Sequence, residues 1–463
     1  MFVGFDYGSA NCAIGVMDKN NVRLLPLSAD SKYLSSTLYA LDRELIAEAV
    51  YQQMPQHLKA DFAKMRGAQL SRAQQARREL DLDKDEQAVF VGSQAVKAYL
   101  DMPEEGFYVR SPKSFLGASG LRNDQVALFE DIVTMMMLHV KSIAESATGL
   151  NNKGVITHAV IGRPVNFQAI GGEESNLQAE SILRLAAKRA GFIDVEFLFE
   201  PLAAGMDYEA SLTEDKVVLV VDVGGGTTDC SVVKMGPSHV NLSQRSQDFL
   251  GHSGQRVGGN DLDIALSMKA FMSHLGLGCH MVNGLPMPSK PFWNAVAVND
   301  ISAQRDFVSL SSRKLIKELI HDAESPELLK RLLKVQQEQL GYRIVRSAEQ
   351  AKIGLTDADS VISKLDYICP RLNAEVSREL FSEAIAVPSA KIQALMQQAL
   401  NVAGVTPDVI YVTGGTARSP AIYDKIADLH PEIPIVVGDH FGSVTAGLTR
   451  WAQRVFKQEK NEN

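Results

Sequence analysis

Short apolar segments that end in small and acidic residues recur at four places along the chain. They occupy residues 2–9, 159–164, 217–227 and 409–416. Apolar runs of this length, without alternating polar positions, indicate strands buried on both faces, as in the centre of an α/β sheet. Apolar residues at helical spacing between these strands, for example in residues 174–190, support an α/β fold class.

The four strands form two similar pairs. Asp6 and Asp222 each end a strand, and each precedes a glycine-containing turn and a second apolar run. The other two strands each precede a helix that begins with small residues, at residues 200–205 and 442–447. Because this set occurs twice, we predict two lobes of similar fold with a cleft between them. We expect lobe I to comprise residues 1–212, lobe II to comprise residues 213–439, and residues 440–463 to pack back onto lobe I.

The charge of the chain limits its partners. Lys and Arg number 47 against 55 Asp and Glu, which gives a formal net charge of −8. Because no net positive field attracts polyanions, we expect no general binding to nucleic acid or to anionic membranes. The cysteines form no Cys-x-x-Cys pair, which excludes a zinc ribbon. The apolar runs are too short to span a bilayer, and we expect a cytoplasmic protein.

Two segments depart from the regular pattern. Residues 39–86 are rich in charge, and they form either a solvated surface helix or an insertion that docks a partner. Residues 275–299 are rich in Gly and Pro and predict a long loop or the edge of a lid. The roles of both segments and the oligomeric state stay open at this point.

Two turns combine an aspartate with glycines, and both favour phosphate binding. Such glycines let the backbone approach a ligand closely and point successive N–H groups at it. The turn residues are Gly8, Ser9 and Ala10 after Asp6, and Gly224, Gly225, Gly226 and Thr227 after Asp222. One such turn alone is more often an ordinary hairpin, but two on facing lobes would hold a triphosphate from both sides. The sequence contains no Gly-x-x-x-x-Gly-Lys motif of the Walker type.

Acidic residues beside these turns suit the hydrolysis of a triphosphate. A triphosphate requires a divalent cation, and Mg²⁺ keeps several waters while one or two carboxylates hold it. Asp6 and Asp222 end the two central strands and are the candidate metal ligands. Positioning and charge stabilisation supply most of the catalysis of phosphoryl transfer. The candidate catalytic residues are therefore Asp6, Glu200, Asp222, Thr227 and Asp229.

A helix predicted over residues 325–355 would complete a nucleotide pocket. Glu349, Lys352 and Thr356 are spaced three and four residues apart, so they share one face. That face can meet a ribose and a base while the Gly414-Gly415 pair lets the backbone lie against a purine. The alternative for the Glu349–Lys352 pair is an ordinary surface ion pair.

Together these motifs resemble the ATPase domain of the DnaK-type heat shock protein 70 (Hsp70) chaperones, within the actin and sugar-kinase superfamily. The resemblance extends from residue 2 to about residue 451, and the Asp-Val-Gly-Gly-Gly-Thr-Thr-Asp sequence at residues 222–229 is a specific signature of that family. It implies a two-lobed actin-like ATPase fold, built from duplicated ribonuclease-H-like domains around a nucleotide cleft. The cofactors that it implies are ATP or ADP with Mg²⁺, with K⁺ as a further ion.

The resemblance also implies roles for individual residues. Asp6, Gly8 and Ser9 would form the first phosphate loop, and Glu200 and Pro164 would relay the nucleotide state across the domain. The second phosphate loop would comprise Asp222, Gly224, Gly225, Gly226 and Thr227, with Asp222 and Asp229 near the metal and the attacking water. The adenosine pocket would comprise Glu349, Lys352, Thr356, Gly414, Gly415, Thr416 and Arg418.

The sequence departs from the family pattern at several positions. Ile353 stands where the chaperones place an arginine that stacks on adenine, and Ala10 lacks the second hydroxyl of the first phosphate loop. By its spacing from Gly92, the catalytic lysine of the chaperones corresponds to Val96, so that Lys97 fills this role only after a local shift. The sequence also stops soon after the last helix, without the apolar linker and the β-rich peptide-binding domain.

We therefore expect a stand-alone, chaperone-like ATPase that binds Mg-ATP between its lobes and hydrolyses it slowly, without a peptide-binding domain. The expected partners are the nucleotide and, through the resemblance, a protein client or a co-chaperone. Fold does not fix function. A small-molecule kinase of the same superfold, a polymerising actin-like filament protein and a nucleotide-gated binding module are the alternatives.

Overall fold

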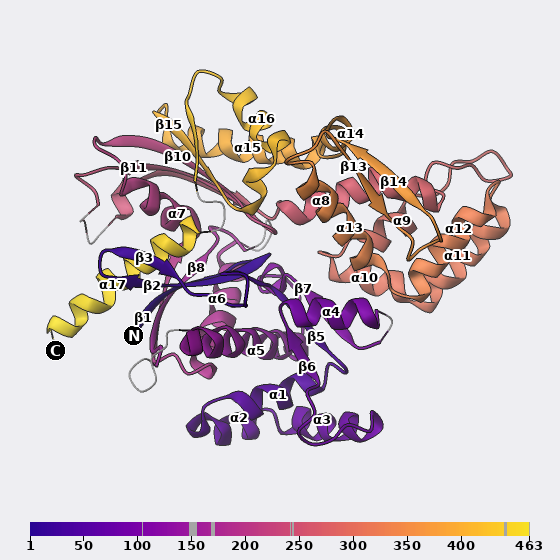
Figure 1. Cartoon of the computed structure of the whole chain (residues 1–463), viewed down its shortest axis with the longest axis horizontal. Helices are drawn as coiled ribbons and strands as arrows, with labels where there is room; N and C mark the ends of the chain where they lie inside the picture. Colours follow the sequence, from indigo (N-terminus) through magenta and orange to yellow (C-terminus); the bar gives the residue numbers. More distant parts are fainter. Residues whose placement is uncertain are drawn as a thin grey trace.

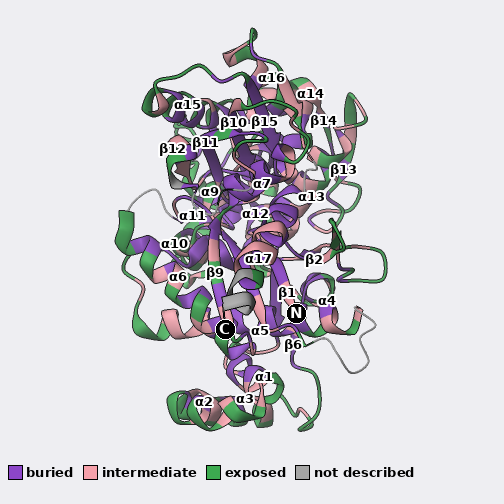
Figure 2. Cartoon of the chain, turned by 90° about the vertical axis from the view of Figure 1, so that its left-hand side faces the viewer, coloured by how far each residue is buried: buried purple, intermediate pink, exposed green. Residues whose placement is uncertain are grey.

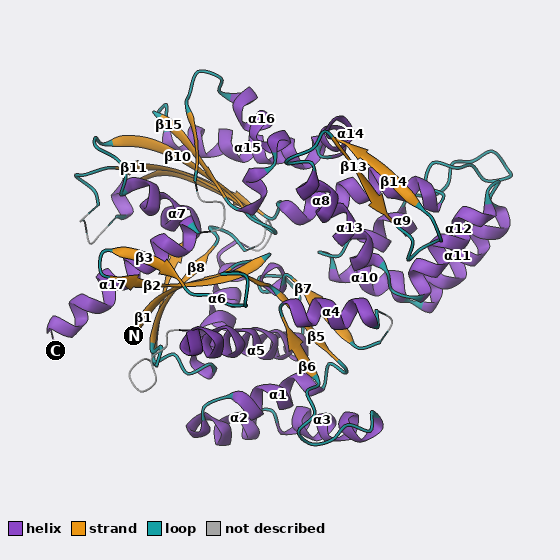
Figure 3. Cartoon of the chain, viewed as in Figure 1, coloured by secondary structure: helices purple, strands orange, loops and turns teal. Residues whose placement is uncertain are grey.

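Two α/β lobes face each other in the computed structural model, and smaller helical and β-sheet parts extend from each of them (Figures 1 and 3). The structure describes residues 1–103, 105–147, 155–167, 172–240, 242, 245–438 and 442–462. The predicted α/β fold class with two lobes is confirmed.

The central sheet of lobe I has the strand order β3-β2-β1-β8-β9, and β4 pairs with β2. Strand β1 is antiparallel to β2 and parallel to β8, and β8 is parallel to β9. The strands are β1 (Phe2–Tyr7), β2 (Asn11–Asp18), β3 (Asn21–Leu24), β4 (Leu34–Ser35), β8 (His158–Arg163) and β9 (Asp194–Phe199).

The central sheet of lobe II repeats this arrangement in the order β12-β11-β10-β15-β16. Strand β10 is antiparallel to β11 and parallel to β15, and β15 is parallel to β16. The strands are β10 (Lys216–Val223), β11 (Thr228–Met235), β12 (Phe249–Gln255), β15 (Val409–Thr413) and β16 (Ile435–Val437). The same order and the same strand directions in both sheets express the internal duplication seen in the sequence.

Two smaller sheets lie outside the central ones. One has the order β6-β5-β7, and the other pairs β13 with β14. Their strands are β5 (Thr37–Ala40), β6 (Val89–Val91), β7 (Phe107–Arg110), β13 (Ser360–Lys364) and β14 (Asn373–Ser377). In Figure 1 the first sheet extends lobe I and the second extends lobe II, on the same side of the molecule.

Helices surround these sheets, and polar residues define several of their starts. The Asp300 carboxylate accepts the backbone N–H groups of Ser302 and Ala303 at the start of α10, as an N-cap should. The lobe I helices are α1 (Leu45–Gln53), α2 (Lys59–Met65), α3 (Gly67–Glu79), α4 (Ser93–Asp101), α5 (Asn123–Ala147) and α6 (Gly172–Arg189). The following helices are α7 (Glu200–Glu209), α8 (Gly259–Leu266), α9 (Lys290–Val296), α10 (Ile301–Val308), α11 (Leu310–Asp322), α12 (Pro326–Gln337), α13 (Gly341–Gly354), α14 (Arg378–Ala384), α15 (Ala386–Ala403), α16 (Pro420–Leu429) and α17 (Ser443–Glu462).

The charged segment 39–86 differs from a simple solvated helix. It contains three helices, α1 to α3, and Arg66 between α2 and α3 is buried rather than solvated. Its guanidinium group donates to both carboxylate oxygens of Asp131 in α5, at 3.2 and 3.0 Å. The buried ion pair fastens the insertion to lobe I, whereas the outer faces of α2 and α3 are largely exposed (Figure 2).

Two further expectations for lobe II require correction. The helix predicted over residues 325–355 is two helices, α12 and α13. The break is at Gln339, which has a positive φ of 49°. Helix α13 then begins at Gly341, which lies so close to α9 that a Cβ on it would collide with the Ala295 carbonyl oxygen. Residues 275–299 are not a loop throughout, because α9 occupies residues 290–296.

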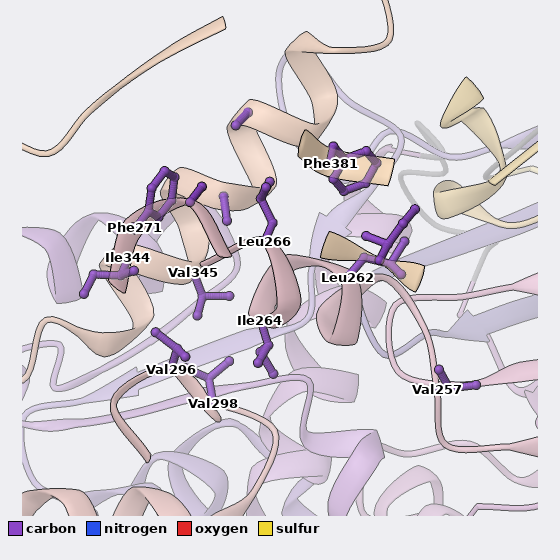
Figure 4. Packing of buried hydrophobic residues seen from close by; sticks show 14 of the residues in the cluster. Val257, Leu262, Ile264, Leu266, Phe271, Val296, Val298, Ile344, Val345 and Phe381 are labelled. Carbon is purple, nitrogen blue, oxygen red and sulfur yellow. The ribbon is translucent and has the colours of Figure 1, made fainter. Parts of the chain in front are cut away.

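Separate hydrophobic cores fill the two lobes. The lobe II core includes Leu262, Ile264 and Leu266 of α8, which point toward residues of neighbouring helices (Figure 4). A third cluster joins the lobes and contains side chains from β8, α7, β10, β15 and α17. This shared cluster ties the two sheets together at the base of the cleft.

Helices α7 and α17 cross within this shared cluster. Helix α17 packs on β1, β2 and β8 of lobe I, whereas α7 packs on β10 and β11 of lobe II. At the crossing, a Cβ on Gly447 would collide with backbone atoms of Ala203. Gly205 is not at this contact, because it packs against Met235 and Val220 of the lobe II sheet.

Candidate functional site

A cavity of about 500 Å³ lies between the two lobes. Its lining comes from β1, β2, α4 and β7 on one side, and from β10, α8, α13 and the β15 end on the other. The predicted site residues in the lining are Asp6, Gly8, Ser9, Ala10, Glu200, Asp222, Gly224, Gly225, Thr227, Glu349, Lys352, Gly414, Gly415 and Thr416. Four predicted residues, Gly226, Asp229, Thr356 and Arg418, are not among the lining residues.

The two glycine turns meet at the base of this cavity. A Cβ on Gly225 would lie 2.7 Å from the Ala10 Cβ, so the turns of the two lobes touch at these residues. Gly226 faces the hydroxyl groups of Ser9 and Ser114 of lobe I rather than the cavity. Small residues are required here because any larger side chain would separate the turns.

The two central aspartates occupy equivalent positions. Asp6 is the penultimate residue of β1 and pairs in register with Ala13, and Asp222 is the penultimate residue of β10 and pairs with Asp229 of the neighbouring strand. The Asp229 carboxylate lies beneath the cavity and accepts the Val165 backbone N–H at 2.8 Å. Four carboxylates, including that of Glu200, are therefore concentrated at the base of the cleft.

This concentration of acids raises the pKa of several carboxyl groups. Burial raises the pKa of Asp6 to about 8, the charges of Glu200 and Asp222 contribute, and Lys113 opposes them. Burial and the charge of Glu200 likewise raise the pKa of Asp229 to about 8. The pKa of Asp222 also lies well above its ordinary value, for the same reasons. A cation among these groups would favour their ionised forms, because an opposite charge lowers a carboxyl pKa.

Lys113 supplies positive charge at this point, and the sequence interpretation missed it. Its buried ammonium group forms an ion pair with Glu200 and donates to the Gly162 carbonyl oxygen at 3.2 Å. Lys97, the residue considered for a catalytic lysine, is exposed on α4. A Ser-Pro-Lys sequence that starts a short 3₁₀ helix after β7 is the local signal that could have drawn attention to Lys113.

The upper part of the cavity contains two ion pairs. Glu349 accepts from Arg110 of the opposite lobe at 2.7 Å. Burial opposes the ionised form of Glu349, but Arg110, Lys352 and Arg346 outweigh it and lower the Glu349 pKa. Lys352 pairs with the buried Asp263 at 2.7 Å. Glu349 and Lys352 are therefore partly buried, and each pairs with a residue of another element rather than forming a surface ion pair with the other.

The remaining adenosine-pocket residues divide into two groups. Gly414 has a positive φ of 90° and packs against the Val223 carbonyl group, and the Thr416 hydroxyl donates to the Gly224 carbonyl oxygen at 3.2 Å. Arg418 is exposed, and Thr356 follows the end of α13 with its carbonyl oxygen bound by Arg378. Ile353 lines the cavity although it is 60% exposed.

The donor set suits a hydrated Mg²⁺ ion better than a directly chelated metal. Within the described part of the chain, no group of three or more His, Cys, Asp or Glu residues is arranged to hold a metal. Asp6 and Asp222 provide two carboxylates that face the cavity, which is the number that commonly holds Mg²⁺ together with waters and phosphate oxygens.

Comparison with known proteins points to one family. Residues 121–275 match the family model described as Hsp70 protein. The chain is 26% identical over 311 residues to Chaperone protein DnaK from one strain of Thermus thermophilus, and 25% identical over 311 residues to the same protein from a second strain. Over these residues the chain is similar to Hsp70 proteins. The resemblance to Hsp70 expected from the sequence, and with it the actin-like ATPase fold, is confirmed.

The Hsp70 match includes much of the site described above. Glu200, Asp222, the second glycine turn and Asp229 all lie within residues 121–275. The two DnaK alignments cover 65% of this chain but 39% of each relative, so the chain spans well under half the length of the curated relatives it matches. Among the described residues, no helix is both long and apolar enough to cross a membrane.

Proposed function

We propose that the chain binds Mg-ATP between its lobes and hydrolyses it slowly, as a chaperone-like ATPase. The observation that carries this proposal is the meeting of two aspartate-glycine turns, one from each lobe, at the base of a single cavity. Backbone N–H groups of the two turns would bind the phosphates from both sides. The relation to Hsp70 supports the chaperone-like interpretation.

The residues at the base of the cavity have complementary roles in this proposal. Asp6 and Asp222 would hold the hydrated Mg²⁺ ion, which would neutralise charge on the phosphates. Glu200, Thr227 and Asp229 would orient the attacking water through their oxygens. Lys113 would stabilise the negative charge that develops on the transferred phosphoryl group. K⁺ is a further ion that this group of carboxylates would accommodate.

The upper cavity would receive the nucleoside. Glu349 and Lys352 would bind the ribose hydroxyls, and the Gly414-Gly415 backbone would lie against the base. Ile353 offers an apolar side chain to the base where an arginine would stack, so we expect weaker adenine binding than such an arginine provides. We expect hydrolysis to be slow because the described cavity lining offers no arginine at the reaction end.

The wider role follows from the family relation. We propose that the chain acts in the cytoplasm with a protein client or a co-chaperone as its partner. ATP binding and hydrolysis would then switch between two states with different affinities for that partner.

Asp222→Asn tests the proposed function. The neutral amide should hold the hydrated ion poorly, so we expect Mg-dependent phosphate release to fall by about tenfold or more. Asp424→Asn, which removes an exposed carboxylate on α16, serves as the matched control and should hydrolyse ATP like the parent. Equal rates of phosphate release by Asp222→Asn and the parent would show that Asp222 does not take part in hydrolysis. Absence of Mg-ATP binding by the parent would refute the proposal.

A further inference from the structure

One face of α13 lines the cavity beyond the residues proposed for the nucleoside. The side chains of this face that belong to the cavity wall are Tyr342, Arg346, Glu349, Gln350 and Ile353, and their spacing of three and four residues places them on one side of the helix. From Tyr342 to Ile353 the helix rises about 16 Å. The proposed nucleoside contacts use the part from Glu349 to Ile353, so the turn that carries Arg346 lines a further part of the cavity.

Arg346 brings unmatched positive charge to this part of the cavity. The two other cations nearby are paired, because Arg110 meets Glu349 at 2.7 Å. Lys352 likewise meets Asp263 at 2.7 Å. Within the described part of the chain, no residue forms a hydrogen bond or an ion pair with the Arg346 side chain, which is partly buried in the cavity wall. Three cations therefore stand against two carboxylates in the upper cavity.

Arg110 and Arg346, which we call the arginine pair, lie beside the same residues although they come from opposite lobes (Figure 1). Arg110 of β7 pairs with Glu349, which follows Arg346 by three residues on α13. Both arginines also act on Tyr108. Burial raises the pKa of Tyr108 to about 12, and the charges of Arg110 and Arg346 oppose this rise. The single carboxylate of Glu349 neutralises one guanidinium group but not both.

Two guanidinium groups on opposite walls of a cavity suit a phosphate group. Arginine donates two parallel N–H groups to phosphate oxygens, and such charge-assisted hydrogen bonds are stronger than neutral ones. The surrounding wall favours this contact, because Tyr99 stacks on Tyr108 at 4.4 Å and Tyr342 meets Tyr108 edge-on at 5.0 Å. These rings exclude water from one side of the arginine pair, and a charged contact is stronger where water is excluded.

The position of Arg346 on α13 identifies the part of a nucleotide that would reach it. In the proposed function, Glu349 and Lys352 bind the ribose hydroxyls, and the 5′-phosphates lie at the glycine turns at the base of the cavity. Arg346 lies about one turn before Glu349, on the side away from Ile353 and the base. A group attached to a ribose hydroxyl would therefore extend toward the arginine pair, whereas the 5′-phosphates would not.

We propose that the arginine pair binds a phosphate ester on the 2′ or 3′ hydroxyl of the ribose, so that the chain binds ribose-phosphorylated adenine nucleotides more tightly than ATP or ADP. This inference rests on the proposed function, because it takes the ribose to lie at Glu349 and Lys352. Arg346 is the specificity-determining residue, since Arg110 also pairs with Glu349 and Arg346 has its charge available for the ligand.

Calorimetric titration of the full chain with three ligands in the presence of Mg²⁺ tests this subsite. The ligands are ADP, ADP with an additional 3′-phosphate and ADP with an additional 2′-phosphate. A phosphate held by two guanidinium groups should lower the Kd, so we expect at least one phosphorylated form to bind the parent about tenfold more tightly than ADP. This ratio should decrease as the salt concentration rises. Arg346→Gln should bring the ratio to within about twofold of one, and Arg346→Lys should retain part of it because the charge remains.

Arg343→Gln is the matched control. Arg343 lies on the same helix, but its guanidinium group lies over the Tyr367 ring at 4.4 Å and Arg343 is not among the residues of the cavity wall. The variant should therefore keep the parental ratio. Because each ratio compares ligands on the same variant, a fraction of unfolded protein does not change it.

The outcomes separate this proposal from the proposed function. If the parent binds Mg-ADP and neither phosphorylated form binds more tightly, the phosphate subsite is overturned and the proposed function stands. A preference that survives unchanged in Arg346→Gln would overturn the role of the arginine pair. A parent that binds none of the three ligands and no Mg-ATP would overturn the proposed function and the subsite with it.

Discussion

Lys113 offsets part of the negative charge that four carboxylates bring to the base of the cleft. Its ion pair with Glu200 is buried, and removing one partner of a buried pair leaves an uncompensated charge. The raised pKa of Asp6, of about 8, already includes the opposing effect of Lys113. Without this lysine, the carboxyl groups would ionise even less readily. In the proposed reaction, the phosphoryl group would also lose a positively charged side chain near the place where its negative charge develops.

Lys113→Met should therefore reduce ATP hydrolysis. We expect the single-turnover rate of ATP hydrolysis to fall by about 100-fold, the usual effect of removing one group that stabilises transition-state charge. Lys97→Met removes the exposed lysine on α4 and is the matched control, expected at the parental rate. Hydrolysis by Lys113→Met within about twofold of the parent would exclude Lys113 from the reaction.

Individual residues differ in how far their place could be read from the sequence. Asp6, Asp222 and the glycine turns carry local signals, because two strands that are each followed by an acid and a glycine turn together favour phosphate binding. The structure brings them together at one cavity. Lys113 and Arg110 are harder to place, because the Ser-Pro-Lys sequence marks only a turn and each residue acquires its partner, Glu200 or Glu349, only when distant elements pack.

At the scale of elements, the crossing of α7 and α17 depends on one glycine. A Cβ on Gly447 would overlap the backbone of Ala203, which cannot move without shifting the helix, whereas a Cβ on Gly205 would meet the flexible end of Met235. The sequence predicted two helices that begin with small residues, and both exist. Which glycine makes the close contact depends on how each helix rotates against its sheet, and the spacing of the residues does not specify that rotation.

Gly447→Ala should destabilise the chain more than Gly205→Ala does. We expect a loss of about 1–3 kcal/mol in the free energy of unfolding, the typical effect of overpacking, measured by urea unfolding. Gly67→Ala, where no neighbouring atom lies within 4 Å of the new Cβ, should be neutral or slightly stabilising because alanine favours a helix. An equal effect of Gly447→Ala and Gly67→Ala would contradict the close crossing.

On the scale of the whole molecule, the two lobes are joined at the base by the crossing helices and at the other end of the cavity by the contacts of Tyr342 with Tyr99 and Tyr108. The presence of two similar lobes was predictable from the sequence because the internal duplication repeats a set of local patterns. The contacts across the mouth were not, since Tyr99 and Tyr342 are more than two hundred residues apart in the chain and neither belongs to a motif.

Binding of Mg-ATP should compact the whole molecule. Both lobes supply phosphate-binding turns, so a triphosphate makes more contacts in the closed arrangement than in an open one, which is the requirement for ligand-driven closure. ADP lacks the γ-phosphate and should close the lobes less. We expect the radius of gyration from small-angle scattering to decrease with saturating Mg-ATP, to decrease less with Mg-ADP, and to stay constant in Asp222→Asn under both conditions. The same radius of gyration in the parent with and without Mg-ATP would show that the turns do not draw the lobes together. Equal compaction by ATP and ADP would show that the γ-phosphate does not contribute to closure.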